Sequence, residues 1–290
     1  MWILLVLFYG IAKGVREICK KKALETSPTM EVLFVYSLIS FLVLIPDIKN
    51  VFGLEPIYFL YIAIKAFVIF IAWICGFKAI KKLPISLYGV LDLSRVTFSS
   101  LLGIVVLNEI MRPLKIAGML LVCIGLVLLK KPSRKRSSSG TNDAEDSSAV
   151  KPVYVIVALL SCLLNAVSGL MDKILMRSIN ESQLQFWYML FLVLMYLGFI
   201  LVTRTKIDVK RAVTNKWIWI LSILFVLADR ALFIANSYTE CTVTTQTLLK
   251  QSGVIVVILS SRFLFKEKDI THKLICACIV IAGIVLGTIA

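Results

Sequence analysis

The sequence predicts an all-α integral membrane protein with ten transmembrane helices, arranged as two inverted five-helix repeats. Three observations lead to this prediction. Hydrophobic residues make up 59% of the 290 positions and charged residues only 17%, with a mean hydropathy of +0.92, whereas soluble domains are about 45–50% apolar and about 25% charged. The apolar residues fall into ten runs, and one hydrophilic segment divides these runs five and five. A soluble fold of this length cannot keep so much apolar surface from water, so lipid must solvate it.

Ten apolar runs are long enough for membrane helices, which need about 20 apolar residues to cross the ~30 Å hydrocarbon layer. Nine spans is the alternative, if one run lies in the membrane interface. The first run does not resemble a signal peptide, because it lacks a basic start and charges at Lys13, Arg16 and Glu17 interrupt it. Arg16 and Lys20 are able to reach the headgroups, whereas Glu17 and Lys13 are equally able to face an internal cavity. The runs are 2–19, 30–46, 57–79, 85–107, 112–129, 153–175, 183–203, 217–238, 243–265 and 270–289.

One hydrophilic segment sets the domain organisation. Residues 131–152 are rich in serine and charge and contain no apolar run. Such a segment cannot bury enough apolar surface to fold, so we expect a flexible linker. The predicted units are a five-helix repeat over 1–130, the linker over 131–152 and a second five-helix repeat over 153–290.

The two halves are also related in sequence. Shifting residues 94–128 by 158 positions onto 252–286 aligns nine identities without a gap. Because each half has an odd number of helices, a second half that follows an aqueous linker enters the bilayer from the opposite side. Inverted repeats of this kind are common in secondary transporters, which bind substrate at the repeat interface near mid-membrane. Chance matches are frequent where a few apolar residue types dominate, but this does not explain three of the identities: Glu109/Glu267, Lys115/Lys273 and Gly125/Gly283.

A family resemblance lies in segments 7–28 (LFYGIAKGVREICKKKALETSP) and 107–129 (LNEIMRPLKIAGMLLVCIGLVLL), with a second copy at 263–287. These segments resemble the EamA domain of the drug/metabolite transporter superfamily, present as two tandem copies over nearly the whole chain. The resemblance implies a ten-helix carrier of small metabolites, amino acids, drugs or nucleotide sugars. The chain departs from the family pattern near Asn165, where an aromatic residue is missing, and in the fourth helix of each copy, which lacks a midway proline.

Charged residues inside the predicted spans are the first candidates for a solute site. A charge at the bilayer centre costs at least about 2.5–3.5 kcal/mol, so each needs a partner or a function. Asp92, Arg95 and Lys250 lie near the middle of the fourth and ninth runs, and Asp229 and Arg230 lie at similar depth in the eighth. Asp92 and Lys250 occupy equivalent positions of the two repeats, so their opposite charges are expected to pair across a central cavity.

Neutral side chains at the same depth complete the predicted substrate site. The alternative interpretation is structural: Asp92 pairs with Arg95 one turn away, Asp229 pairs with Lys250, and the neutral groups join helices. The neutral candidates, four hydrogen-bonding side chains and one aromatic ring able to stack on a solute, are Tyr88, Asn165, Gln246, Gln251 and Trp73.

Small residues at four-residue spacing predict close helix contacts. Gly10 and Gly14 let the first helix approach a neighbour. Gly283 and Gly287 do the same for the last helix, either between the halves or in a homodimer.

Charge and cysteine usage exclude other classes of protein. The net charge of +15 is gathered in short basic clusters between the apolar runs, which is typical of membrane-protein loops rather than of a nucleic-acid interface. The chain has a single histidine, His272, and no CxxC motif, so we predict no metal, no cofactor and no enzyme.

The predicted function is secondary transport of a small polar or amphipathic metabolite by alternating access through a cavity between the repeats. The alternatives are a non-transporting membrane receptor or scaffold and a membrane-embedded enzyme. The expected partners are the solute and membrane lipids, and the expected location is the plasma membrane. Basic residues concentrate in the connections after odd-numbered runs, which places these connections in the cytoplasm and both termini outside, whereas the family resemblance implies that both termini are inside.

Overall fold

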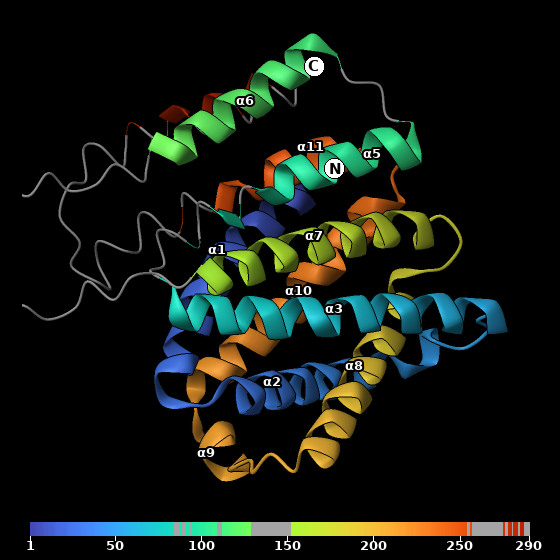
Figure 1. Ribbon diagram of the computed structural model, residues 1–290. Helices are drawn as coiled ribbons and strands as arrows, with labels where there is room; N and C mark the ends of the chain where they lie inside the picture. The colour runs from blue at the N-terminus through green and yellow to red at the C-terminus, as the bar shows by residue number, and fades with distance from the viewer. Residues whose placement is uncertain are drawn as a thin grey trace, which may run out of the picture.

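The computed structural model describes residues 1–83, 91–92, 94–108, 112–128 and 152–253, with Tyr88, Val256 and isolated positions between 275 and 286. Every regular element within these residues is helical. Figure 1 shows the long helices layered across one another, with the first and second halves interleaved.

Each described helix other than η1 and α9 overlaps one of the predicted runs, although helix ends differ from the predicted ones and parts of the fourth and ninth runs lie outside the described residues. Two short elements, η1 and α9, were not predicted, and the tenth run lies largely outside the described residues. The first half contains α1 (Trp2–Thr26), α2 (Thr29–Leu44), η1 (Ile45–Asn50), α3 (Pro56–Lys82), α5 (Ser94–Leu107) and α6 (Pro113–Leu128). The second half contains α7 (Pro152–Leu175), α8 (Glu181–Thr203), α9 (Val209–Thr214), α10 (Lys216–Ser237) and α11 (Val243–Lys250).

Five segments are long and apolar enough to cross a membrane, which makes this chain an integral membrane protein. They are Thr29–Asn50, Pro56–Lys82, Pro152–Leu175, Glu181–Thr203 and Lys216–Ser237. Helix α1 is equally long, but charges from Lys13 onward interrupt its apolar character. Large apolar side chains such as Leu60, Phe67 and Val202 point outward from the bundle and are more than half exposed, as expected of surfaces that lipid covers.

Local sequence explains where several helices begin. Pro56 occupies the first turn of α3, where a missing N–H is harmless. Asn180 and Gln183 form a capping box at the start of α8, and the Asp208 side chain accepts a hydrogen bond from the Arg211 N–H at the start of α9. These caps satisfy N–H groups that the helix itself leaves unpaired.

The two halves pack through reciprocal helix pairs. Helix α1 of the first half packs against α10 of the second, and α7 of the second packs against α3 of the first. Likewise, α2 contacts α10 while α8 contacts α3, and α2 and α8 contact each other. Figure 1 shows α3 and α7 running side by side across the bundle. Neither half therefore forms its core alone.

Polar contacts hold the connections together at two ends of the bundle. At one end, the last residue of α1 and the first turn of α2 meet the α9 region. Asn215 donates to Thr26 Oγ1 at 2.8 Å, and Arg211 donates two hydrogen bonds to the buried Glu31 at 3.0 and 2.6 Å. The Glu31 carboxylate raises the pKa of Arg211 through these hydrogen bonds. At the other end, Gln183 donates to the Phe52 carbonyl at 3.0 Å.

The prediction of close contact at Gly10 and Gly14 is confirmed. A Cβ added at Gly10 would clash with the side chain of Ser252, and one added at Gly14 would clash with the carbonyl of Gly253. Helix α1 therefore lies directly against residues 252–253 of the second half. The predicted contact through Gly283 and Gly287 stays a prediction, because Gly287 lies outside the described residues.

Candidate functional site

A cavity of about 110 Å³ lies between the two halves. Helices α1, α3 and α5 line it from the first half, and α7, α8, α10 and α11 line it from the second. The charged residues that line it are Lys13, Arg16, Glu17, Lys20, Lys65, Arg95, Asp172, Asp229 and Lys250.

Helix α1 contributes a continuous polar stripe to this wall. Its lining residues are separated by four, three, one and three positions, which places them on one face of an α-helix. This spacing orients the charges of α1 toward the cavity rather than toward lipid. The stripe consists of Tyr9, Lys13, Arg16, Glu17 and Lys20.

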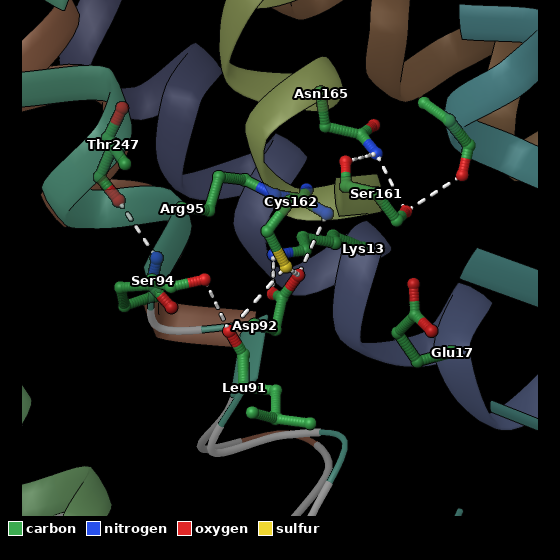
Figure 2. A network of polar contacts seen from close by, with 12 residues as sticks. Lys13, Glu17, Leu91, Asp92, Ser94, Arg95, Ser161, Cys162, Asn165 and Thr247 are labelled. Carbon is green, nitrogen blue, oxygen red and sulfur yellow. Dashed lines mark hydrogen bonds and ion pairs between the residues drawn. The ribbon is translucent and has the colours of Figure 1, made fainter. Parts of the chain in front are cut away.

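Asp92 holds two bases of the first half together (Figure 2). Lys13 Nζ lies 3.0 Å from Asp92 Oδ2, and Arg95 Nη2 lies 2.8 Å from Asp92 Oδ1. Asp92 is not among the residues that line the cavity; it lies behind Arg95 and Lys13, which do. The Asp92–Arg95 pair matches the structural alternative, and the expected pairing of Asp92 with Lys250 is replaced by the bond to Lys13.

Two ion pairs join the halves across the cavity. Arg16 Nη1 of α1 lies 3.3 Å from Asp229 Oδ1 of α10, and Lys65 Nζ of α3 lies 3.0 Å from Asp172 Oδ1 of α7. The Lys65 side chain is 2% exposed, so its pair is shielded from solvent. Asp229 therefore binds Arg16 rather than Lys250, contrary to the structural alternative.

Lys250 is the last residue of α11 and lines the cavity, where its ammonium group contacts neutral groups. Its Nζ donates to Gln246 Oε1 at 2.7 Å and lies 5.2 Å from the centre of the Tyr9 ring. Gln246 in turn donates to Asn236 Oδ1. This chain of contacts orients the ammonium group and leaves its charge facing the cavity.

The other predicted neutral residues also line the cavity. Tyr88, Asn165 and Gln251 do so together with Trp73. Asn165 donates to the Ser161 carbonyl of its own helix at 2.7 Å, as Figure 2 shows. The Trp73 ring packs 5.2 Å from the Tyr36 ring and 5.2 Å from the Phe225 ring, so part of its surface is already used within the aromatic core.

Arg230, like Asp92, is a predicted site residue that does not line the cavity. Its guanidinium lies 2.9 Å from Asp47 Oδ2 and donates to Ser182 Oγ at 2.9 Å. It therefore joins α10 to η1 and α8 near the end of the bundle. Adjacent residues point about 100° apart on a helix, so Asp229 faces the cavity and Arg230 does not.

Sequence reasoning left six charged lining residues out of the predicted site. Lys13, Arg16, Glu17 and Lys20 belong to the stripe of α1, and its helical spacing was a usable signal. Lys65 and Asp172 are isolated charges in otherwise apolar runs, and the cost of burying a charge in a membrane was the signal there. Their partners depend on how α3 packs on α7, which the sequence does not state.

This arrangement can bind and orient a polar solute between charges of both halves. Within the described part of the chain, His, Cys, Asp and Glu residues form no group of three that could hold a metal ion. The fold and the cavity thus define a polytopic helical membrane protein with a charged internal site.

Comparisons with known proteins identify its family. The model of the EamA-like transporter family matches residues 1–130 and 152–289, so the chain belongs to the EamA-like transporter family, with two tandem copies of its domain. No curated protein sequence matches the chain. A solved structure described only as a crystal structure of a protein is similar to 99% of this chain over 96% of its own length, with a TM-score of 0.73 and 14% sequence identity. This similarity supports the fold alone.

Proposed function

We propose that this chain is a secondary transporter, which moves a small polar or amphipathic solute across a membrane by alternating access. The observation that carries the proposal is the cavity itself, whose charged wall is built from both halves inside an apolar helix bundle. Buried charges in a membrane are costly and usually mark a pathway for ions or solutes. Membership of a transporter family supports the same function.

We further propose ten spans in two inverted repeats. The reciprocal packing of α1 on α10 and α7 on α3 is what a two-fold relation between the halves predicts. The end contacts support inversion. Thr26, the last residue of the first helix of the first half, contacts Asn215 at one end. Asn180, which follows the first helix of the second half, contacts Asn50 at 3.5 Å at the other end.

The glycines at equivalent positions of the two halves lie in different surroundings, and this supports an alternating mechanism. Gly14 and Glu17 of the first repeat correspond in spacing to Gly169 and Asp172 of the second. Gly14 lies against Gly253, whereas no atom of the described residues lies within 4 Å of a Cβ added at Gly169, which lines the cavity. One half is thus closed against its neighbour while the other is open. In our proposal the opposite-facing state exchanges these two environments, which moves the cavity opening from one side to the other.

The test is solute flux in liposomes that contain the purified chain, guided by a thermal-shift screen of metabolites. We expect a solute that raises the melting temperature to be taken up, and we expect Asp92→Asn and Lys250→Gln to reduce its uptake at least tenfold. Lys210→Gln on α9, whose side chain is exposed and lies away from the cavity, is the matched control. Normal uptake by both site variants at equal protein levels would place the solute site elsewhere, and binding without flux would instead support a receptor.

The proposed location is the plasma membrane. The basic end of the bundle, where Asn215 after α9 meets the last residue of α1, would face the cytoplasm because basic connections are retained there.

A further inference from the structure

The charges of the cavity do not balance. Four carboxylates belong to it: Glu17, Asp172 and Asp229 line it, and Asp92 binds two of the lining bases from behind. Among the residues that the structure describes, the cavity therefore holds two more positive than negative charges. The bases that line it are Lys13, Arg16, Lys20, Lys65, Arg95 and Lys250.

The pairing shows where the excess charge lies. Lys20 is bound by Glu17, and Lys65 and Arg16 are bound by the carboxylates of the opposite half. Lys13 and Arg95 share the single charge of Asp92. One excess charge therefore belongs to the Lys13–Arg95 group and the other to Lys250.

Two of these bases have unused capacity for an anion. Lys250 makes its hydrogen bond to a neutral amide oxygen, that of Gln246, and no carboxylate of the described residues lies within 4.0 Å of its nitrogen. Arg95 Nε is buried and has no hydrogen-bond acceptor within the described chain. Both face the same cavity from different halves.

We propose that the transported solute is a small organic anion whose carboxylate or phosphate group binds between Lys250 and the Lys13–Arg95 group. This inference rests on the proposed transport function. Uncompensated charge in a water-poor interior is unfavourable, and an oxyanion would neutralise it while it accepts charge-assisted hydrogen bonds from the ammonium and guanidinium groups. A cationic solute would add a third positive charge.

Two buried acceptors indicate what the rest of the solute carries. Glu17 Oε2 and Gln251 Oε1 lie in the cavity wall without a hydrogen-bond donor among the described residues. A hydroxyl or amino group on the solute would satisfy them. The cavity of about 110 Å³ is somewhat smaller than the ~150 Å³ that holds benzene, so the solute that fits this state is small.

The experiment uses the full chain in detergent and in liposomes with three sets of probes. The carboxylate set is lactate and glycerate, the phosphate set is glycerol phosphate and inorganic phosphate, and the matched set without negative charge is glycerol and ethanolamine. We expect thermal stabilisation and uptake with one or both anionic sets and not with glycerol or ethanolamine. Comparison of the first two sets identifies the anionic group.

The Lys250→Gln variant tests the location of the site. We expect it to lose at least tenfold in affinity for the anion while its melting temperature without solute stays equal or rises, because a buried uncompensated charge has been removed. Lys250→Arg retains the charge and is expected to retain binding, and Lys210→Gln is the exposed control. If Lys250→Gln has a higher melting temperature without solute but a lower affinity for the anion, Lys250 has a binding role and not a structural one.

The outcomes are distinguishable. Uptake of ethanolamine or glycerol, and of no anion, would overturn the inference while it leaves the transport function intact. Equal anion affinity in the wild type and Lys250→Gln would overturn the assigned site. Anion binding that depends on Lys250 but produces no flux would support the anion site and contradict the transport function.

Discussion

Lys65 Nζ on α3 lies 3.0 Å from Asp172 Oδ1 on α7, and this ion pair is the counterpart of the one between Arg16 and Asp229. In each case the first helix of one half is joined to the third long helix of the other. The base belongs to the first half in both pairs and the carboxylate to the second. The two equivalent helix contacts between the halves therefore each contain one ion pair.

Loss of either Lys65 or Asp172 alone should destabilise the protein, whereas replacement of both should not. Removing one partner leaves a buried charge without compensation, which costs about 3–5 kcal/mol, whereas replacing both partners by apolar residues is often neutral. We expect Lys65→Met to lower the melting temperature in detergent strongly and the double variant Lys65→Met/Asp172→Leu to recover most of the loss. Thermal denaturation of the purified proteins measures both.

The control is the more exposed pair of Lys22 with Glu25 on α1, where the carboxylate side chain is 49% exposed. Surface pairs contribute about 0–1 kcal/mol, so Glu25→Gln should change stability little. If the double variant is as unstable as Lys65→Met, the two residues act independently and the coupling is absent.

Gly14 should tolerate no side chain. A Cβ there meets the carbonyl of Gly253, so Gly14→Ala must push α1 away from residues 252–253, and overpacking of this kind costs about 1–3 kcal/mol. We expect a lower melting temperature and reduced uptake. Gly198→Ala on α8 is the matched control, because no atom of the described residues lies within 4 Å of its Cβ position. Equal effects of the two substitutions would show that the contact at Gly253 is unimportant.

Apolar run length predicted most of the fold, because a helix that crosses lipid must satisfy its own backbone and be about 20 residues long. Run length did not predict where a helix ends when charged residues form part of that helix. The first run was predicted to end at residue 19, whereas α1 continues to Thr26. Lys20 binds Glu17 and Lys22 binds Glu25, each three residues apart, and such pairs stabilise a helix that hydropathy alone does not indicate.

The site was predictable only as far as its contacts are local. The three-residue spacing of Asp92 and Arg95 is sufficient by itself to indicate their pair. The bond of Asp92 to Lys13 spans 79 positions and depends on how α1 lies in the bundle. Asp229 and Arg230 were both predicted as site residues because they lie at the same depth in the membrane. Only the rotation of α10 about its axis determines that Asp229 faces the cavity and Arg230 does not.

Arg230 should therefore have little part in solute binding. It binds Asp47 and Ser182 outside the cavity, and its side chain is 34% exposed, so we expect Arg230→Gln to cost about 1 kcal/mol of stability or less. The KM for the transported solute should stay within about twofold of the wild type. A tenfold rise in KM with unchanged stability would return Arg230 to the binding site.

Inverted repeats predict which positions share a side of the membrane. Exposed residues Lys49 and Arg177 follow α2 and α7, near the end where Asn180 contacts Asn50. Glu25 and Lys206 are exposed at the end where Thr26 contacts Asn215.

In a chain whose seven native cysteines are replaced, we expect cysteine at 49 or 177 to react with an impermeant maleimide from outside intact cells, because the basic end is retained in the cytoplasm. Cysteine at 25 or 206 should react only after permeabilisation. If positions 25 and 177 react from the same side, the repeats are not inverted, and if all four reactivities are reversed, the repeats are inverted but both termini face the cytoplasm.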